Sequence, residues 1–145
     1  MIEKIIIYCL LFAFSIQRTD SILAFRRFNI EISNHLEGNK QLMVQCRSGV
    51  NSTQVVFLAF SGVFKFPIIL DFKTLIWCNL WKGPDFKQHV SFDAFVEKES
   101  FIHDVCGSMK PNVCFWQAQD DGIWVRNNPT GDLKISLPRH YQHRH

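Results

Sequence analysis

Four cysteines carry the clearest chemistry of this 145-residue chain, because they can close disulfide bonds. Cys46, Cys78, Cys106 and Cys114 follow an apolar N-terminal run, and the fifth cysteine, Cys9, lies inside that run. Their spacing does not suit a zinc site, since no C-x-x-C pair occurs and no histidine lies at finger-like spacing. An even number of cysteines after the leader is typical of proteins that fold in an oxidising compartment. We therefore expect two disulfides, and no metal or other cofactor.

The pairing of these cysteines stays open, because four cysteines allow three connectivities. We favour the pairing of Cys46 with Cys114 and of Cys78 with Cys106. From the entropy of loop closure, the first bond would stabilise the fold by about 4 kcal/mol and the second by about 3.5 kcal/mol. A Cys106–Cys114 bridge would close a much shorter loop, for about 2.5 kcal/mol on the same basis.

The first 21 residues have the pattern of a secretory signal peptide. Lys4 supplies a positive charge, and the unbroken apolar run from Ile5 to Phe14 follows it. That run fits the roughly 7–15 apolar residues of a signal peptide and falls short of the roughly 20 that span a bilayer. We expect cleavage near Ser21, with cleavage after Ser15 or Ala24 as alternatives. The competing interpretation is a signal anchor or a buried core helix.

Asn51-Ser52-Thr53 is an N-glycosylation sequon in a polar stretch that has the composition of a loop. Sequons mark exposed loops of secreted proteins. Together with the leader and the cysteines, this predicts a glycan on Asn51 and a secreted, extracellular protein without membrane insertion.

Other polar residues do not form a recognisable catalytic or metal-binding set. Asp120 and Asp121 are adjacent and precede Gly122, which favours a tight turn over acid–base chemistry. The histidines of the C-terminal tail lack neighbouring structure that would orient them as metal ligands. No Gly-x-Ser-x-Gly elbow occurs. We expect no catalytic, cofactor-binding or metal-binding residue, and hence no enzyme.

The formal net charge of +3 is too small for a nucleic-acid-binding protein, which usually concentrates far more positive charge on one face.

The aromatic content of 14%, mostly phenylalanine, suits half-buried strands.

Short apolar or alternating runs separated by turn residues predict strands, and no segment has a helical period over three turns. In the expected strand at residues 89–96, Val90, Phe92 and Ala94 should lie on one face and Phe95 on the other. Pro67 predicts an edge strand or a strand end. The expected strands cover residues 28–32, 42–46, 55–60, 64–68, 74–78, 89–96, 101–106, 113–118, 123–125 and 133–137. This spacing predicts an all-β sandwich or barrel over residues 22–137, followed by a mobile, basic, histidine-bearing tail at 138–145.

Four short motifs, in this order and spacing, resemble the plant self-incompatibility S-protein homologues. They are Cys46-Arg47-Ser48, Thr74-Leu75-Ile76-Trp77-Cys78, Cys106 with Cys114-Phe115-Trp116, and Asp121-Gly122-Ile123-Trp124. The resemblance covers roughly Asn39 to Val125. It departs from the family pattern at Gln45, where a histidine is frequent, and at residues 49–54, where an acidic stretch is usual.

The resemblance implies a disulfide-stapled β-sandwich of about seven or eight mostly antiparallel strands. It also implies a small secreted recognition or signalling ligand. We expect this ligand to act as a monomer and to bind an unidentified cell-surface receptor. The loops expected to contact that receptor are 49–54, 79–88 and 107–112. The alternative function is an extracellular carbohydrate-binding or defence module.

Two of the four tryptophans lie close to cysteines: Trp77 precedes Cys78, and Trp116 is two residues after Cys114. This position predicts that both pack against a disulfide in the core. Trp81 lies close to the turn at Lys82-Gly83, so we expect it to be partly exposed and a possible contact residue.

Overall fold

The computed structural model of the protein describes residues 1–11, 27–49, 51–69 and 74–138. The expected cleavage sites at Ser15, Ser21 and Ala24 lie outside these residues, as does the expected tail from residue 139 onward. Residues 2–11 form a helix whose apolar side chains are exposed. No helix in the described ranges is long and apolar enough to cross a membrane.

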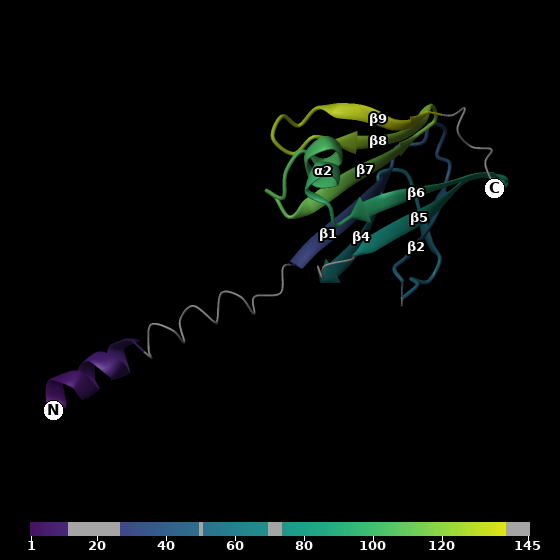
Figure 1. Ribbon diagram of the computed structural model, residues 1–145. Coiled ribbons are helices and arrows are strands. Elements are labelled where there is room, and N and C mark those ends of the chain that lie inside the picture. The colour runs from purple at the N-terminus through teal and green to yellow at the C-terminus, as the bar shows by residue number, and fades with distance from the viewer. Residues whose placement is uncertain (12–26, 50, 70–73, 139–145) are drawn as a thin grey trace.

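Nine strands of the described chain form two sheets that face each other as a β-sandwich (Figure 1). The five-stranded sheet has the order β4-β1-β7-β8-β9, and the four-stranded sheet has the order β3-β2-β5-β6. Neighbouring strands are antiparallel, except that β1 and β7 run parallel. The strands are β1 (Arg27–Asn34), β2 (Leu42–Arg47), β3 (Val56–Leu58), β4 (Val63–Ile69), β5 (Leu75–Lys82), β6 (Gln88–Val96), β7 (Val113–Gln119), β8 (Gly122–Arg126) and β9 (Leu133–Pro138). The predicted all-β sandwich is confirmed, with nine strands rather than seven or eight.

Alternation of side chains decides which face of each strand is buried. In β1, Phe28, Ile30 and Ile32 are fully buried, and the residues between them lie on the outer face. The buried side chains of both sheets form one apolar cluster, whose removal from water is the main stabilising contribution to the fold. β4 lies at a sheet edge, as Pro67 predicts.

The prediction of a strand at residues 101–106 is wrong, because this segment is helical. A short helix, α2 (Glu99–Phe101), continues into the π-helical turn η1 (Ile102–Cys106). Phe101, Ile102 and Val105 pack against the core, which is the spacing of a helix face. Gly107 then ends the turn with φ of 84°, a conformation that glycine adopts without strain.

β6 departs from the alternation expected for it. The pairing of β5 with β6 shifts by one residue, so that Ile76 lies opposite Phe95 while Trp77 lies opposite Asp93. This β-bulge leaves Ala94 between the two pairs, and both Ala94 and Phe95 are therefore buried. The prediction that Phe95 faces away from the core is wrong, since its ring packs 4.7 Å from that of Phe28.

The structure pairs Cys46 with Cys78 and Cys106 with Cys114, so the favoured pairing is wrong. Cys46 and Cys78 lie directly opposite each other in β2 and β5, with their Cα atoms 4.1 Å apart. Cys114 lies in the other sheet, where Cys106 of η1 approaches it to a Cα separation of 5.2 Å. Strand register therefore decides the pairing, and neither disulfide joins the two sheets.

The strand directions place the connections at two opposite ends of the sandwich. The disulfide end holds all four bonded cysteines, the connection 48–55, η1 and the loop 107–112. The ion-pair end holds the connections 35–41, 59–62, 83–87 and 120–121.

Candidate functional site

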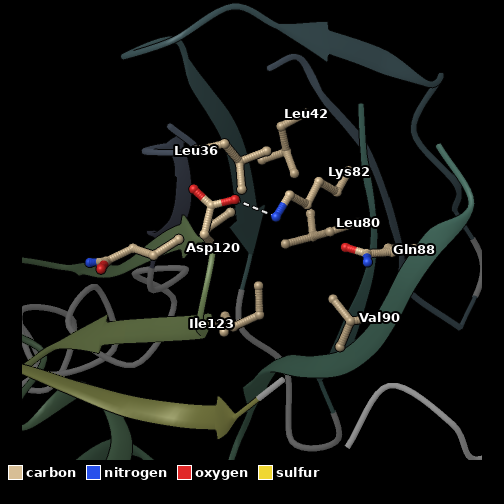
Figure 2. Close-up of a pocket in the computed structure, with 11 residues that line it drawn as sticks. Leu36, Leu42, Leu80, Lys82, Gln88, Val90, Asp120 and Ile123 are labelled. Carbon is tan, nitrogen blue, oxygen red and sulfur yellow. Dashed lines mark ion pairs between the residues drawn. The ribbon is translucent and has the colours of Figure 1, made fainter. Parts of the chain in front are cut away.

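A carboxylate at the ion-pair end connects the two sheets. Asp120 lies in the turn between β7 and β8, and its Oδ1 is 3.1 Å from the Nζ of Lys40. Lys82, at the end of β5, pairs with the same oxygen. Figure 2 shows the Lys82 ammonium directed at the Asp120 carboxylate from the opposite side of the cavity. The backbone N–H of Glu37 donates to the other oxygen, Oδ2, at 2.7 Å.

These contacts set the charge of Asp120. Its partial burial opposes ionisation, but hydrogen bonds from Lys82, the Glu37 N–H and Lys40 outweigh burial and hold the pKa of this carboxyl well below its usual range. Asp120 is therefore an anion at any physiological pH. This makes it a partner for cations and unsuitable as a proton donor in catalysis.

The cavity beside Asp120 is small and mostly apolar. Its volume is about 30 Å³, and its walls include Leu36, Leu80 and Ile123 (Figure 2). That volume is far below the roughly 300–1,000 Å³ that is usual for ligand-binding pockets, so the cavity has no room for a substrate. We conclude that Asp120 stabilises the packing of the sheets. The turn predicted at Asp120-Asp121 is confirmed, whereas the ion pairs were missed because their partners lie far away in sequence.

The first of the expected contact loops, 49–54, lies at the disulfide end; residue 50 lies outside the described residues, and hydrogen bonds hold the rest of the loop. The N–H of Ser48 donates to the carbonyl oxygen of Asn51 at 2.7 Å, and the N–H of Asn51 donates to Ser48 Oγ at 3.1 Å. Thr53 and Cys46 exchange two further hydrogen bonds, of 2.9 and 3.0 Å. Because Cys46 is itself bonded to Cys78, the base of this loop is rigid. Asn51 is exposed within it.

The loop 107–112 lies at the same end and is closed by the other disulfide. Asn128, in the connection from β8 to β9, donates from Nδ2 to the carbonyl oxygens of Ser108 at 2.9 Å and Val113 at 2.7 Å. Its backbone N–H donates to the carbonyl oxygen of Cys106 at 2.8 Å. The side chains of Lys110, Pro111 and Asn112 remain exposed. These contacts hold the backbone of the loop, Met109 packs against the core, and three side chains stay exposed.

The prediction of the third contact loop, 79–88, is partly wrong. β5 extends to Lys82 and β6 begins at Gln88, so the connection itself is limited to residues 83–87. It lies at the ion-pair end, opposite the other two loops. The three loops therefore cannot form one contact surface.

The tryptophans divide between the core and the surface. Trp116 is buried, as predicted, and its Nε1 donates to the carbonyl oxygen of Ala94 in the other sheet at 3.1 Å. The prediction of a core position for Trp77 is wrong, because the period of two that buries Cys78 leaves Trp77 half-buried on the outer face. Trp81 is partly exposed, as predicted, and its ring stacks on that of His89 with centroids 4.8 Å apart.

Within the described ranges, no group of three or more His, Cys, Asp or Glu side chains is arranged to hold a metal ion.

Comparison with known proteins agrees with the fold and the motifs. Residues 29–138 match the family described as plant self-incompatibility protein S1. S-protein homolog 21 of Arabidopsis thaliana is 33% identical over 121 residues, which cover 81% of this chain and 81% of that relative. S-protein homolog 8 of the same plant is 33% identical over 97 residues, covering 66% of this chain and 69% of that relative.

A solved structure has the same fold. It belongs to SPH (Self-Incompatibility Protein Homologue) proteins, described as a widespread family of small, highly stable, secreted proteins from plants. The TM-score is 0.54 at 21% identity, with 80% of this chain and 92% of that chain covered.

Proposed function

Because the chain belongs to the plant self-incompatibility protein S1 family, we propose that it is a secreted recognition ligand that binds a cell-surface partner. The observation that carries this proposal is the pair of loops at the disulfide end, 48–55 and 107–112. Each is anchored by a disulfide at its base.

Such anchoring suits recognition. Binding through a flexible loop loses affinity to the entropy of ordering that loop, and a loop that is already fixed avoids most of this cost. In both loops the backbone contacts come from bonded cysteines, Ser48, Thr53 and Asn128, so that exposed side chains such as Lys110 and Asn112 are free to contact a partner. Loops of this kind can change sequence between relatives while the sandwich stays the same.

Three further features belong to the proposal. The N-terminal segment, residues 1–21, acts as a cleaved signal peptide, and its exposed apolar helix at residues 2–11 has the character that such a segment needs. Asn51, exposed in a turn, carries an N-linked glycan. The mature protein acts as a monomer and without catalysis.

Two of the tryptophans, Trp81 and Trp116, give no support to the alternative of a carbohydrate-binding or defence module. A sugar-binding platform needs open ring faces, whereas the ring of Trp81 is covered by His89 and that of Trp116 is buried.

The test is binding of the secreted, fluorescently labelled protein to plant protoplasts. We expect saturable binding that excess unlabelled protein displaces and that protease treatment of the cell surface abolishes. Binding that does not saturate, or that survives removal of surface proteins, would count against a protein receptor. A C106A/C114A variant, in which the loop 107–112 is released, should bind more weakly.

A further inference from the structure

The indole of Trp124 is held in place on the outer face of the five-stranded sheet, where β8 lies between β7 and β9 (Figure 1). Its Nε1 donates to Oδ1 of Asp121 at 2.8 Å, so the side chain runs back along β8 toward the turn. Gly122 lies between these two residues, on the same face as Trp124 by the alternation of the strand. It is nevertheless buried, which the indole lying over it explains. Because Gly122 has no side chain, the ring can lie against the sheet with its other face outward.

The outward face of this indole is open. Trp124 is partly exposed, and among the described residues no other aromatic ring and no cation stacks on it. By contrast, Trp81 stacks on His89, and Trp116 is buried. Ile135 lies opposite Trp124 in β9 and is 41% exposed, so it extends the apolar surface beyond the ring. Trp124 thus provides the open ring face that the other two tryptophans lack.

Polar groups edge the ring on its β7 side and at the turn. Gln117 of β7 lies opposite Trp124. Gln119, two residues further along β7, lies opposite Gly122 and on the same outer face. Nε2 of Gln119 donates to Oε1 of Gln117 at 3.3 Å, which leaves Nε2 of Gln117 as a donor and Oε1 of Gln119 as an acceptor. Oδ2 of Asp121 is a further acceptor, since the indole occupies only Oδ1.

An open aromatic face edged by amides and a carboxylate suits a neutral sugar. The C–H groups of a pyranose pack on an aromatic ring, while its hydroxyls both donate and accept hydrogen bonds. A pyranose whose substituents are all equatorial has the flattest C–H faces and makes the largest contact with an indole. The carboxylate of Asp121 beside the ring repels an acidic sugar. Arg126, the next charged residue along this face of β8, lies over the ring of Phe115 at 3.6 Å from its centroid.

We propose that the outer face of β8 binds a neutral, β-linked polysaccharide of the plant cell wall, with one pyranose ring stacked on Trp124. Gln117, Gln119 and Asp121 then bond its hydroxyls, and Ile135 contacts the next sugar. A weak and reversible contact of this kind retains a secreted protein in the wall. The site lies on a sheet face, whereas the loops proposed to bind the receptor lie at the disulfide end. The inference therefore goes beyond the proposed function and does not depend on it.

The test is saturation-transfer difference NMR of the secreted protein with cellohexaose, a soluble β-linked glucan oligosaccharide. We expect saturable binding with a Kd on the order of 1 mM, because a single ring is stacked. W124A should weaken binding at least about tenfold, a loss typical of an aromatic residue at the centre of a binding site. Q117A/Q119A should weaken it about fivefold, because hydrogen bonds contribute less than the stacked ring.

Trp81 provides the matched control, because it is also a partly exposed tryptophan on the outer face of a sheet. W81A should leave the affinity for cellohexaose unchanged. The thermal midpoint and the near-UV circular dichroism of each variant show whether the sandwich is intact. W124F keeps an aromatic ring over Gly122 and protects the fold where W124A does not. It should lower the affinity about threefold, since the smaller ring makes less contact with the sugar.

The outcomes separate this inference from the proposed function. Absence of cellohexaose binding, or an equal loss in the Trp124 and Trp81 variants, would overturn the inference. Binding of a released high-mannose N-glycan in place of cellohexaose would also overturn it, because the sugar would then belong to a glycoprotein. Protoplasts carry no wall, so a failure of protoplast binding removes the proposed function and leaves the sugar site untouched.

Discussion

The two ends of the sandwich are stabilised by different means. At the disulfide end, covalent bonds act within each layer, one between neighbouring strands β2 and β5 and one between η1 and β7. At the ion-pair end, side chains connect the two layers. Asp120 pairs with Lys40 and Lys82, and the amide of Asn34 at the end of β1 donates to the carbonyl oxygen of Leu58 in β3 at 2.9 Å.

This difference determines which loops can vary. Two connections at the ion-pair end contribute Lys40 and Asp120 to the contact between the layers, so a substitution at either residue lowers the stability of the sandwich. The loops at the disulfide end are anchored by cysteines at their bases, and the side chains of Lys110, Pro111 and Asn112 are exposed. Variation is therefore tolerated best at the disulfide end, which is why we place recognition there.

The largest effect should come from removing the disulfide of the four-stranded sheet. C46A/C78A should lower the free energy of unfolding by about 3.5 kcal/mol, because the bond closes a long loop, whereas C106A/C114A should lower it by about 2.5 kcal/mol. Urea titration of both variants measures the difference between their free energies of unfolding, provided that the dependence on urea concentration has the same slope in both. An equal or reversed order would show that the two bonds do not act through loop entropy.

Substitution of Asn34 should give the next largest loss of stability, because this residue is fully buried and its side chain makes three hydrogen bonds. Its Nδ2 donates to the carbonyl oxygens of Lys40 and Leu58, and its Oδ1 accepts from the N–H of Leu36. N34A leaves these groups without partners and should lower the free energy of unfolding by about 2–3 kcal/mol. The control is S33A, whose half-buried hydroxyl makes one hydrogen bond, to the carbonyl oxygen of Trp116 at 3.1 Å. If S33A costs as much as N34A, the connection between the layers does not depend on Asn34.

Asp120 should give the smallest of the three effects, about 1 kcal/mol for D120N at neutral pH, since the ion pairs are partly hydrated. The pKa of Asp120 is lower in the folded protein than in the unfolded chain, so its contribution is fully present above the unfolded value of about 3.9. It is lost progressively as the pH falls below that value. The gap in thermal midpoint between wild type and D120N should therefore narrow in acid.

The neighbouring carboxylate provides the matched control for Asp120. Asp121 is exposed and accepts a hydrogen bond from Trp124 Nε1 at 2.8 Å, which an asparagine oxygen can also accept. D121N should change the midpoint little at any pH. If the difference in thermal midpoint between wild type and D120N stays constant from neutral to acid pH, the ion pairs of Asp120 do not provide the stabilisation.

Local patterns predicted most of the fold. The alternation of Phe28, Ile30 and Ile32 is visible in the sequence because the period of a strand is two residues. The helical turn at η1 was missed because it is too short for a helical period to stand out, although the apolar spacing from Phe101 to Val105 was present. The β-bulge at Ala94 depends on the pairing with β5 and has no local signature.

The sequence did not predict the contacts between residues that lie far apart in the chain. Lys40 lies 80 residues from its partner Asp120, and no local pattern joins them. The disulfide pairing follows from the register of β2 against β5, which places Cys46 opposite Cys78. The cysteines as a set were predicted, and their partners became clear only from the arrangement of the strands.

The measurement that tests the central claim most directly is an exchange of loops between this protein and S-protein homolog 21, one end at a time. Exchange of residues 107–112 should abolish or redirect saturable binding to protoplasts, while exchange of residues 84–87 at the ion-pair end should leave binding unchanged. Both variants should retain the unfolding midpoint of the wild type, which shows that the sandwich is intact. Binding that survives the first exchange and is lost with the second would contradict the assignment of recognition to the disulfide end.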